Sequence, residues 1–181
     1  LRQHLSDPRE QAMYAVVHGG TDLDLRHASA AYLSSLPFDG YALGGSLGKD
    51  TDEMLQMLGQ VMPSLPRAKP NHLLGIADEV SVRGAVALGV DTFDSCLPTR
   101  NARHGTLNTR AGKIHIGQGK YKSDFGPVDP TLETIGHSRA YLHHLYRVKE
   151  PLFTMLASQH NLQYMGALVA ELREQIAADE I

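Results

Sequence analysis

The sequence predicts an α/β fold in which parallel strands are covered by helices. Short apolar runs alternate with helical segments up to residue 94, and these runs lack the apolar–polar alternation of a half-exposed sheet. Polar or glycine residues follow each run, in the positions where functional loops lie in parallel α/β proteins. The 181 residues, 42% of them hydrophobic, are enough to bury a core.

The first half of the chain contains capping residues and glycines at regular intervals. Asp7-Pro8-Arg9-Glu10 reads as a helix restart with proline in the first turn. Thr21 or Asp22 can cap one helix, and Asp50 or Thr51 can cap another whose apolar residues repeat with helical spacing. We therefore predict helices at 1–12, 21–35, 52–61 and 79–88, and strands at 13–17, 40–45, 72–76 and up to 94.

After residue 103 the pattern changes. Residues 107–119 alternate weakly around the turn Thr109-Arg110-Ala111-Gly112, which predicts a β-hairpin. Residues 124–130 contain two prolines and a glycine and form a connector, and helices are expected at 138–146 and 150–178.

Four strands correspond to half of a (β/α)8 barrel, because a complete barrel takes about 250 residues. Four parallel strands alone would leave two exposed edges, which natural sheets usually avoid. We therefore expect a missing N-terminal half or pairing with another chain, and Leu1 in place of Met fits a processed chain or an excised fragment. In this scheme residues 1–128 form the C-terminal half of the barrel, and residues 129–181 form a helical subdomain.

Composition excludes several classes of protein. One cysteine, Cys96, rules out an internal disulfide and suits a reducing compartment, so we expect a cytoplasmic protein. No apolar run approaches the roughly 20 residues that span a bilayer. The net charge of −3 argues against sequence-blind binding of nucleic acid, yet residues 100–122 carry six Lys or Arg and no acid. This basic run is either a phosphate-contacting surface or an ordinary solvated loop.

The segment 91–103 concentrates the candidate chemistry. Asp94 ends an apolar strand, Pro98 cannot continue a strand ladder, and Arg100 and Arg103 follow. A carboxylate at a strand's end beside cations is how a nucleophile and an anion clamp would be arranged. The alternative is that Asp94 only ends its strand and caps the next turn.

Several segments carry a resemblance to a known family. They are Phe-Asp-Gly-Tyr-Ala-Leu-Gly-Gly (38–45), Leu-Leu-Gly-Ile (73–76), Asp-Thr-Phe-Asp-Ser-Cys-Leu-Pro-Thr-Arg-Asn-Ala-Arg (91–103), Asp-Phe-Gly-Pro-Val-Asp-Pro (124–130) and His-Ser-Arg-Ala-Tyr-Leu-His-His-Leu (137–145). Together they resemble the tRNA-guanine transglycosylases, which exchange guanine in tRNA anticodons for queuine or its 7-deazaguanine precursors. The motifs occur in the family's order and cover roughly the C-terminal half of a member.

The resemblance implies roles for the acidic and basic residues of this segment. Asp94 would attack the ribose C1′ of the target guanosine and form a covalent RNA ester, as a retaining glycosidase does with its sugar. Arg100 and Arg103 would grip the tRNA anticodon loop and lower the pKa of Asp94. The family's second catalytic aspartate and its base-clamping Asp and Cys would lie upstream of residue 1.

The resemblance also implies a binding site for the exchanged base. Gly44 and Gly45 would bring main-chain amides close to the heterocycle. Leu74 would lie against the base plane, although it also reads as an ordinary buried strand residue. Gly48 favours queuine by leaving room for its cyclopentenediol, although it also reads as a helix-entry glycine. His18 stands where the family has a base-reading glutamine, and it offers fewer hydrogen-bonding groups.

The chain departs from the family at the structural zinc site, which uses a Cys-x-Cys-x-x-Cys run and a later histidine. Asp129-Pro130 is followed by residues 131–137 without a cysteine, and only His160 stands at a ligand position. One imidazole is not a tetrahedral site, so we expect no metal and no cofactor. The resemblance also implies a homodimer or heterodimer. The alternatives to an enzyme are a non-catalytic tRNA-binding or dimerisation subunit and a truncated remnant.

Overall fold

The computed structural model describes residues 1–7, 11–132 and 135–181, and the chain forms two compact units, Leu1–Ser95 and Cys96–Ile181. Most of the predicted helix restart at Asp7-Pro8-Arg9-Glu10 lies outside the described residues. The division of the chain into barrel half (1–128) and helical subdomain (129–181) stays a prediction.

The first unit is built around a parallel sheet. Its strands are ordered β1-β2-β3-β4, and the three neighbouring pairs are all parallel. The elements of this unit are α1 (Arg2–Ser6), β1 (Tyr14–Val17), α2 (Leu23–Ser34), β2 (Gly40–Leu43), α3 (Thr51–Val61), the 3₁₀ helix η1 (Met62–Ser64), β3 (Asn71–Leu73), α4 (Glu79–Ala87) and β4 (Thr92–Phe93). The predicted α/β fold with a parallel sheet is confirmed.

In the first unit, each α-helix that follows a strand begins at an aspartate. Asp22, Asp50 and Asp78 are the N-cap residues of α2, α3 and α4, and each carboxylate accepts a hydrogen bond from the backbone N–H three residues later. This bond satisfies one of the otherwise unpaired amides of the first helical turn. The caps fix where the chain leaves the loops that follow β1, β2 and β3.

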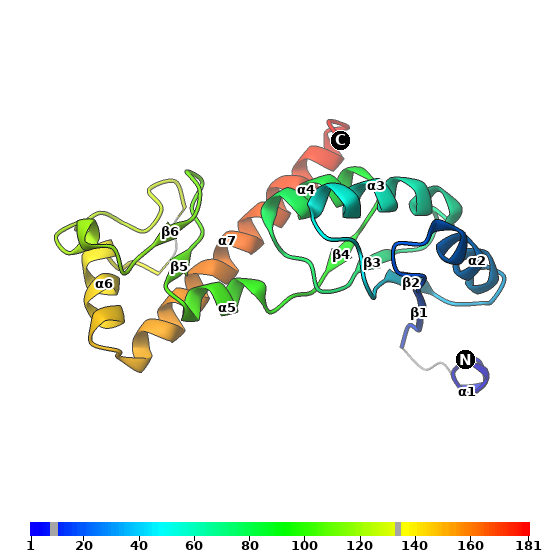
Figure 1. Cartoon of the computed structure of the whole chain (residues 1–181), viewed down its shortest axis with the longest axis horizontal. Coiled ribbons are helices and arrows are strands. Elements are labelled where there is room, and N and C mark those ends of the chain that lie inside the picture. The colour runs from blue at the N-terminus through cyan, green and yellow to red at the C-terminus, as the bar shows by residue number, and fades with distance from the viewer. Residues whose placement is uncertain (8–10, 133–134) are drawn as a thin grey trace. The chain divides into compact units, whose positions relative to one another are not determined.

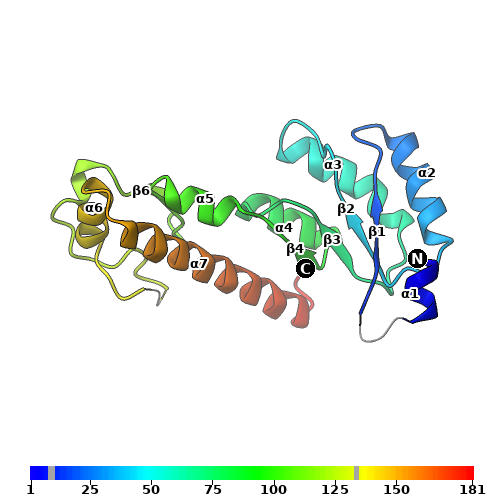
Figure 2. The ribbon, with the colours of Figure 1, turned by 90° about the horizontal axis from the view of Figure 1, so that it is seen from below.

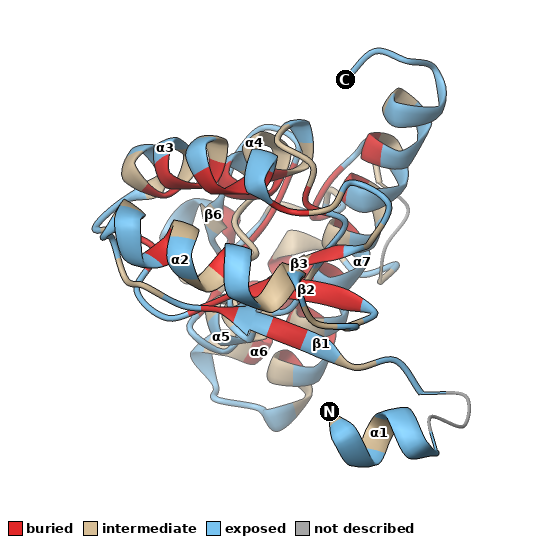
Figure 3. Cartoon of the chain, turned by 90° about the vertical axis from the view of Figure 1, so that its right-hand side faces the viewer, coloured by how far each residue is buried: buried red, intermediate tan, exposed pale blue. Residues whose placement is uncertain are grey.

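The two faces of the sheet have different environments. Ala15, Val17, Tyr41, Leu43 and Leu73 are buried in one core with residues of α2, α3 and α4, which lie together on that side (Figure 1). Side chains alternate along a strand, so the intervening residues point to the opposite face. In β1 these intervening residues are the exposed ones, as the alternating colours of that strand in Figure 3 show.

The second unit combines a hairpin with helices. Its elements are α5 (Leu97–Arg103), β5 (Thr106–Leu107), β6 (Ile114–His115), the 3₁₀ helix η2 (Gly119–Tyr121), α6 (Arg139–Arg147) and α7 (Pro151–Ala177). β5 and β6 are antiparallel, and Thr109 and Gly112 exchange backbone hydrogen bonds, which confirms the predicted hairpin and its turn. Within the described residues, no helix is long and apolar enough to cross a membrane.

α5 packs along α7 in this unit (Figure 2). The buried Asn161 of α7 connects the two helices and the hairpin, because its amide nitrogen donates to the carbonyl oxygens of Pro98 and Thr106 at 2.9 and 3.0 Å. Its amide oxygen accepts from the Asn108 N–H at 2.9 Å. A single side chain therefore satisfies three backbone groups that would otherwise be buried without partners.

Candidate active site

The candidate site lies at the carboxyl ends of the four parallel strands. His18 follows β1, Gly44 follows β2, Leu74 follows β3 and Asp94 follows β4. The last residue of each of these strands packs into the core that the helices cover. The alternation along each strand therefore places all four on the face opposite the helices. Successive members of this set are 20 to 30 positions apart in the sequence, and the parallel sheet brings them together at the carboxyl ends of its strands.

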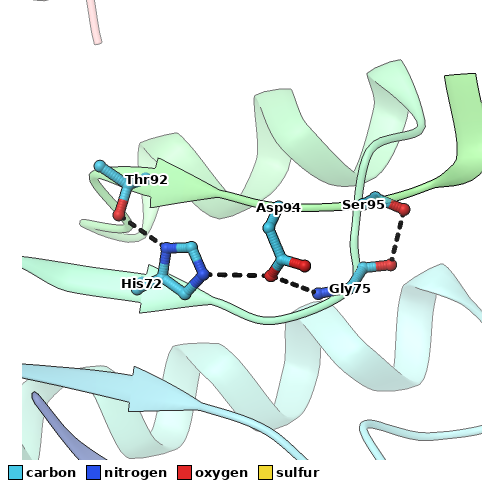
Figure 4. Close-up of polar contacts among 5 residues, drawn as sticks. All are labelled: His72, Gly75, Thr92, Asp94 and Ser95. Carbon is cyan, nitrogen blue, oxygen red and sulfur yellow. Dashed lines mark hydrogen bonds and ion pairs between the residues drawn. The ribbon is translucent and has the colours of Figure 1, made fainter.

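Asp94 is held at this edge by two donors from β3 and the turn after it (Figure 4). Its Oδ1 accepts from the backbone N–H of Gly75 at 3.1 Å and lies 3.1 Å from Nε2 of His72. His72 pairs in register with Thr92, and its Nδ1 lies 2.8 Å from the Thr92 hydroxyl. The Asp94 side chain is still 61% exposed, so its second oxygen remains accessible to a ligand.

These donors also determine the charge of Asp94. The Gly75 amide, followed by the His72 ring, holds the pKa of the Asp94 carboxyl below its ordinary value. Hydrogen bonds to a carboxylate stabilise its ionised form. An ionised, exposed and anchored carboxylate is suited to nucleophilic attack on an electron-poor carbon.

Gly75 is fixed at both of its backbone polar groups. Its N–H donates to Asp94, and its carbonyl oxygen accepts from the Ser95 hydroxyl at 3.1 Å. Its φ of 79° lies in the left-handed region, which glycine adopts without steric cost. The turn after β3 and the end of β4 are therefore tied together on both sides of the carboxylate.

The base-site residues predicted from the sequence lie beside one another. A Cβ added to Gly44 would come within 2.6 Å of Leu74 Cδ1, and one added to Gly45 would come within 3.3 Å of His18 Nδ1. Glycine at both positions therefore makes room for neighbouring side chains of the site. Leu74 is 37% exposed and lies in the turn after β3, and its contact with the base stays a prediction.

A buried arginine that was not predicted from the sequence organises the loops after β1 and β2. Arg26 of α2 is fully buried and donates to the carbonyl oxygens of Gly20, Val17, Gly44 and Ser46 at 2.8 to 3.0 Å. Burial lowers the pKa of its guanidinium. Because these carbonyls flank His18 and Gly45, Arg26 holds both loops of the base site in place.

Gly48 lies farther along the loop that leads into α3. Its φ is 117°, and an added Cβ would approach the Glu53 side chain to 3.0 Å. Glu53 also accepts from the Lys49 N–H at 2.8 Å. The local backbone therefore requires glycine here, which supports its interpretation as a helix-entry residue, and its effect on the choice of base stays a prediction.

Arg100 and Arg103 belong to the second unit, in the last turn of α5, and both are exposed. Nη2 of Arg100 donates to Sγ of Cys96 at 2.9 Å. The other basic residues of the run are also exposed, namely Arg110, Lys113, Lys120 and Lys122. Arg110 forms an ion pair with Glu171 at 2.6 Å, so part of its charge is already matched. The proximity of Asp94 to these cations stays a prediction.

Comparison with known proteins identifies the family. The sequence profile described as queuine tRNA-ribosyltransferase matches residues 1–181, which is the whole chain. The chain belongs to the queuine tRNA-ribosyltransferase family. The resemblance inferred from the motifs is thereby confirmed.

Named relatives agree with this assignment. The queuine tRNA-ribosyltransferase of Protochlamydia amoebophila is 50% identical over 184 residues, which cover 100% of this chain and 48% of the relative. That of Chlamydia pneumoniae is 44% identical, with 100% of this chain and 50% of the relative covered. The chain thus spans about half the length of the curated relatives it matches.

The residues present do not fit the structural zinc that the family resemblance implies. His160 is fully buried, and its Nε2 lies 2.7 Å from the carbonyl oxygen of Asn108, so this nitrogen is already engaged. Burial lowers the pKa of the His160 imidazole. Asp129 accepts from the Arg110 and Thr131 backbone amides at 2.6 and 2.8 Å. Across the part of the chain that the structure describes, no three His, Cys, Asp or Glu are grouped to hold a metal ion.

His72, Gly75 and Arg26 were not predicted as site residues from the sequence. The signal for His72 was present, because a polar residue stands within an apolar strand next to the strand of Asp94. Gly75 was noted only as a strand-end residue. For Arg26 a single cationic residue in a helix gives no comparable signal, since such residues are usually exposed.

Proposed function

We propose that this chain carries the nucleophile of a queuine tRNA-ribosyltransferase. The reaction replaces guanine at the wobble position of a tRNA anticodon with queuine or a 7-deazaguanine precursor. Family membership supports the reaction class, and the geometry of Asp94 supports its role. The proposal includes a cytoplasmic location, where tRNA is available.

Asp94 acts in two steps. In the first step a carboxylate oxygen forms a bond to ribose C1′ while the C1′–N9 bond of guanosine breaks, and guanine leaves with the bonding electrons and acquires a proton. In the second step N9 of the incoming base loses its proton and attacks C1′, and the Asp94 carboxylate is released. Both steps develop positive charge on the sugar, which a nearby anion stabilises.

One observation carries this proposal: the Asp94 carboxylate is anchored by one oxygen, is 61% exposed, and lies at the same end of the sheet as His18, Gly44 and Leu74. An aspartate that served only to cap a turn would bond to its own local backbone. Asp94 instead bonds to Gly75 and His72, which are 19 and 22 residues away.

The remaining groups contribute binding. In this proposal Leu74 contacts the base plane, His18 bonds to the base edge, and the amides of Gly44 and Gly45 approach the heterocycle. Gly48 leaves room for queuine. Arg100 and Arg103 bind phosphates of the anticodon loop, and the other exposed cations of the basic run extend this contact.

The same reasoning leads us to propose how the sheet is completed into a barrel. The exposed face of the parallel sheet becomes the interior of a (β/α)8 barrel, completed by four further strands from a preceding segment or a second chain. β1 and β4 are the outermost strands of the sheet, so their outer edges are where the added strands would pair, and closure of the barrel would cover the second face of the sheet. A dimer is part of this proposal.

We also propose that the chain holds no structural zinc. The hydrogen-bonded side chains of Asp129, His160 and Asn161 order this region in its place, because they satisfy buried backbone groups of the hairpin and α5. Metal analysis of the purified protein tests this directly. The expected result is less than one tenth of an equivalent of zinc, and stoichiometric zinc that resists dialysis would contradict it.

The test of function is covalent capture of tRNA. The protein is mixed with unmodified tRNA and a guanine analogue, and denaturing electrophoresis detects a slower protein–RNA band. Asp94→Asn abolishes the band, because an amide oxygen is a poor nucleophile. Asp39→Asn is the matched control, since Asp39 is also exposed and its pKa is lowered by a backbone amide and a histidine.

The control distinguishes a chemical role from a structural one. Asp39 precedes β2, at the amino end of the sheet, so the proposal predicts a normal band for Asp39→Asn. Intact tRNA binding without any band in the wild-type protein would instead favour a non-catalytic subunit.

A further inference from the structure

The two hydrogen-bond donors around Asp94 both contact the same carboxylate oxygen. Both the Gly75 N–H and the His72 ring bond to Oδ1, each at 3.1 Å, and the two dashed lines that end on Asp94 in Figure 4 meet at this one oxygen. Within the described residues, no hydrogen bond of the protein reaches Oδ2. The carboxylate is therefore fixed in rotation while one of its oxygens stays free.

The position of the hydrogen on His72 follows from the same contacts. An ionised carboxylate can only accept, so Nε2 of His72 carries a hydrogen. In the neutral ring this leaves Nδ1 as an acceptor for the Thr92 hydroxyl, 2.8 Å away. His72 and Thr92 face each other on neighbouring strands, so the rigid sheet sets the orientation of the ring.

We propose that His72, oriented by Thr92, is a positioning residue that holds Oδ1 of Asp94 and thereby assigns the bond-forming role to Oδ2. This inference rests on the proposed function and specifies how its nucleophile is aimed. Oδ2 forms the bond to ribose C1′, and Oδ1 becomes the carbonyl oxygen of the ester. The Nε2–H and Gly75 N–H bonds to Oδ1 persist in the ester and guide release of the carboxylate in the second step.

Orientation of this kind affects rate more than binding. A misplacement of about 1 Å between reacting atoms can cost about a hundredfold in rate. His72 touches the carboxylate rather than the base or the RNA, so its loss leaves tRNA affinity unchanged. The expected signature is a reduced rate of adduct formation at an unaltered tRNA Kd.

Two matched pairs of variants test the proposal, each made in the protein at its natural length. His72→Met removes the donor at similar length, whereas His72→Gln keeps an N–H near the position of Nε2. Thr92→Val removes the hydroxyl, whereas Thr92→Ser keeps it. We expect His72→Met to slow adduct formation about tenfold to a hundredfold and His72→Gln to restore most of the rate. Thr92→Val slows the reaction more than Thr92→Ser does.

Nitrogen NMR of the His72 ring gives a readout that does not require activity. We expect the Nε2–H tautomer in the wild-type protein, a shifted Nε2 resonance in Asp94→Asn, and a smaller share of this tautomer in Thr92→Val. A wild-type adduct rate retained by His72→Met would overturn the inference and leave the proposed function intact. Absence of any wild-type adduct would count against the proposed function, and an Nδ1–H tautomer or an Nε2 resonance unmoved by Asp94→Asn would overturn the inference by itself.

Discussion

Arg26 donates to the carbonyl oxygen of Gly44 at 3.0 Å from a side chain that solvent does not reach. The bond joins α2 to the end of β2, and three further carbonyls share the same guanidinium. Removal of a buried cation that is surrounded by backbone dipoles lowers the free energy of unfolding, because each buried carbonyl oxygen then has no hydrogen-bond donor. The two base-site loops therefore depend on one helical residue.

Arg26→Met should destabilise the protein by about 3–5 kcal/mol, because buried carbonyls would be left without donors. Urea denaturation measures the free energy of unfolding. Arg83→Met is the control, because Arg83 pairs with Glu79 one turn away on a partly exposed helix surface and should contribute less than about 1 kcal/mol. Equal effects of the two substitutions would show that Arg26 has no special structural role.

The pKa of Asp94 should lie below the ordinary value of about 3.9. The Gly75 amide is the main cause and His72 the second, so His72→Met should raise this pKa only in part. Because the pKa of Asp94 is depressed in the folded protein, its carboxylate stays ionised as pH falls through the ordinary pKa of an aspartate. It becomes protonated only at a lower pH. Carbon NMR titration of the side-chain carboxyl checks this, and a value at or above the ordinary one would contradict the described hydrogen bonds.

The fold was predictable where local signals and packing agree. Strand-end glycines, aspartate caps and apolar runs gave the four strands and the helices between them, and Thr109 to Gly112 marked the hairpin turn. α5 was missed, because Pro98 was interpreted as the end of a strand. In the structure Pro98 lies in the first turn of α5, where its missing N–H costs nothing.

The candidate site was predictable in its residues but not in its contacts. Asp94, Leu74 and the glycines were found from motifs, and the parallel sheet brings them together. His72 acts on Asp94 across neighbouring strands, and that relation depends on strand register rather than on any local pattern. Arg26 was unpredictable for a different reason, since its partners are backbone carbonyls that leave no trace in composition.

His160 should make stability depend on pH near neutrality. Burial lowers its folded pKa, so the unfolded chain binds the proton more readily. The stability that the neutral, buried His160 contributes is fully present above the pKa of histidine in the unfolded chain, about 6.5. It is lost as pH falls through the pKa in the folded protein, at up to about 1.4 kcal/mol per pH unit. Urea denaturation at several pH values between about 7.5 and 5.5 measures the slope.

His160→Gln provides the comparison for that slope, because glutamine can still donate to the Asn108 carbonyl oxygen but does not titrate. The variant should unfold with a smaller dependence on pH across the same interval. Identical slopes for the two proteins would mean that His160 does not remain neutral when folded.

Arg100→Ala and Arg103→Ala should each weaken tRNA binding and reduce its salt dependence by roughly one counterion. Filter binding over a series of salt concentrations gives the affinity and the slope together. Arg67→Ala is the control, since Arg67 is exposed and precedes β3 at the amino end of the sheet. Affinity and slope unaffected by both substitutions in α5 would assign these arginines to another surface role.

Mapping the residue to which the RNA becomes covalently attached shows whether Asp94 is the nucleophile. The protein–RNA adduct is trapped, digested with ribonuclease and protease, and sequenced by tandem mass spectrometry. We predict a ribose-linked nucleotide on Asp94 in the wild-type protein and in Asp39→Asn, and none in Asp94→Asn. Attachment to a different side chain, or an undiminished adduct in Asp94→Asn, would contradict the account.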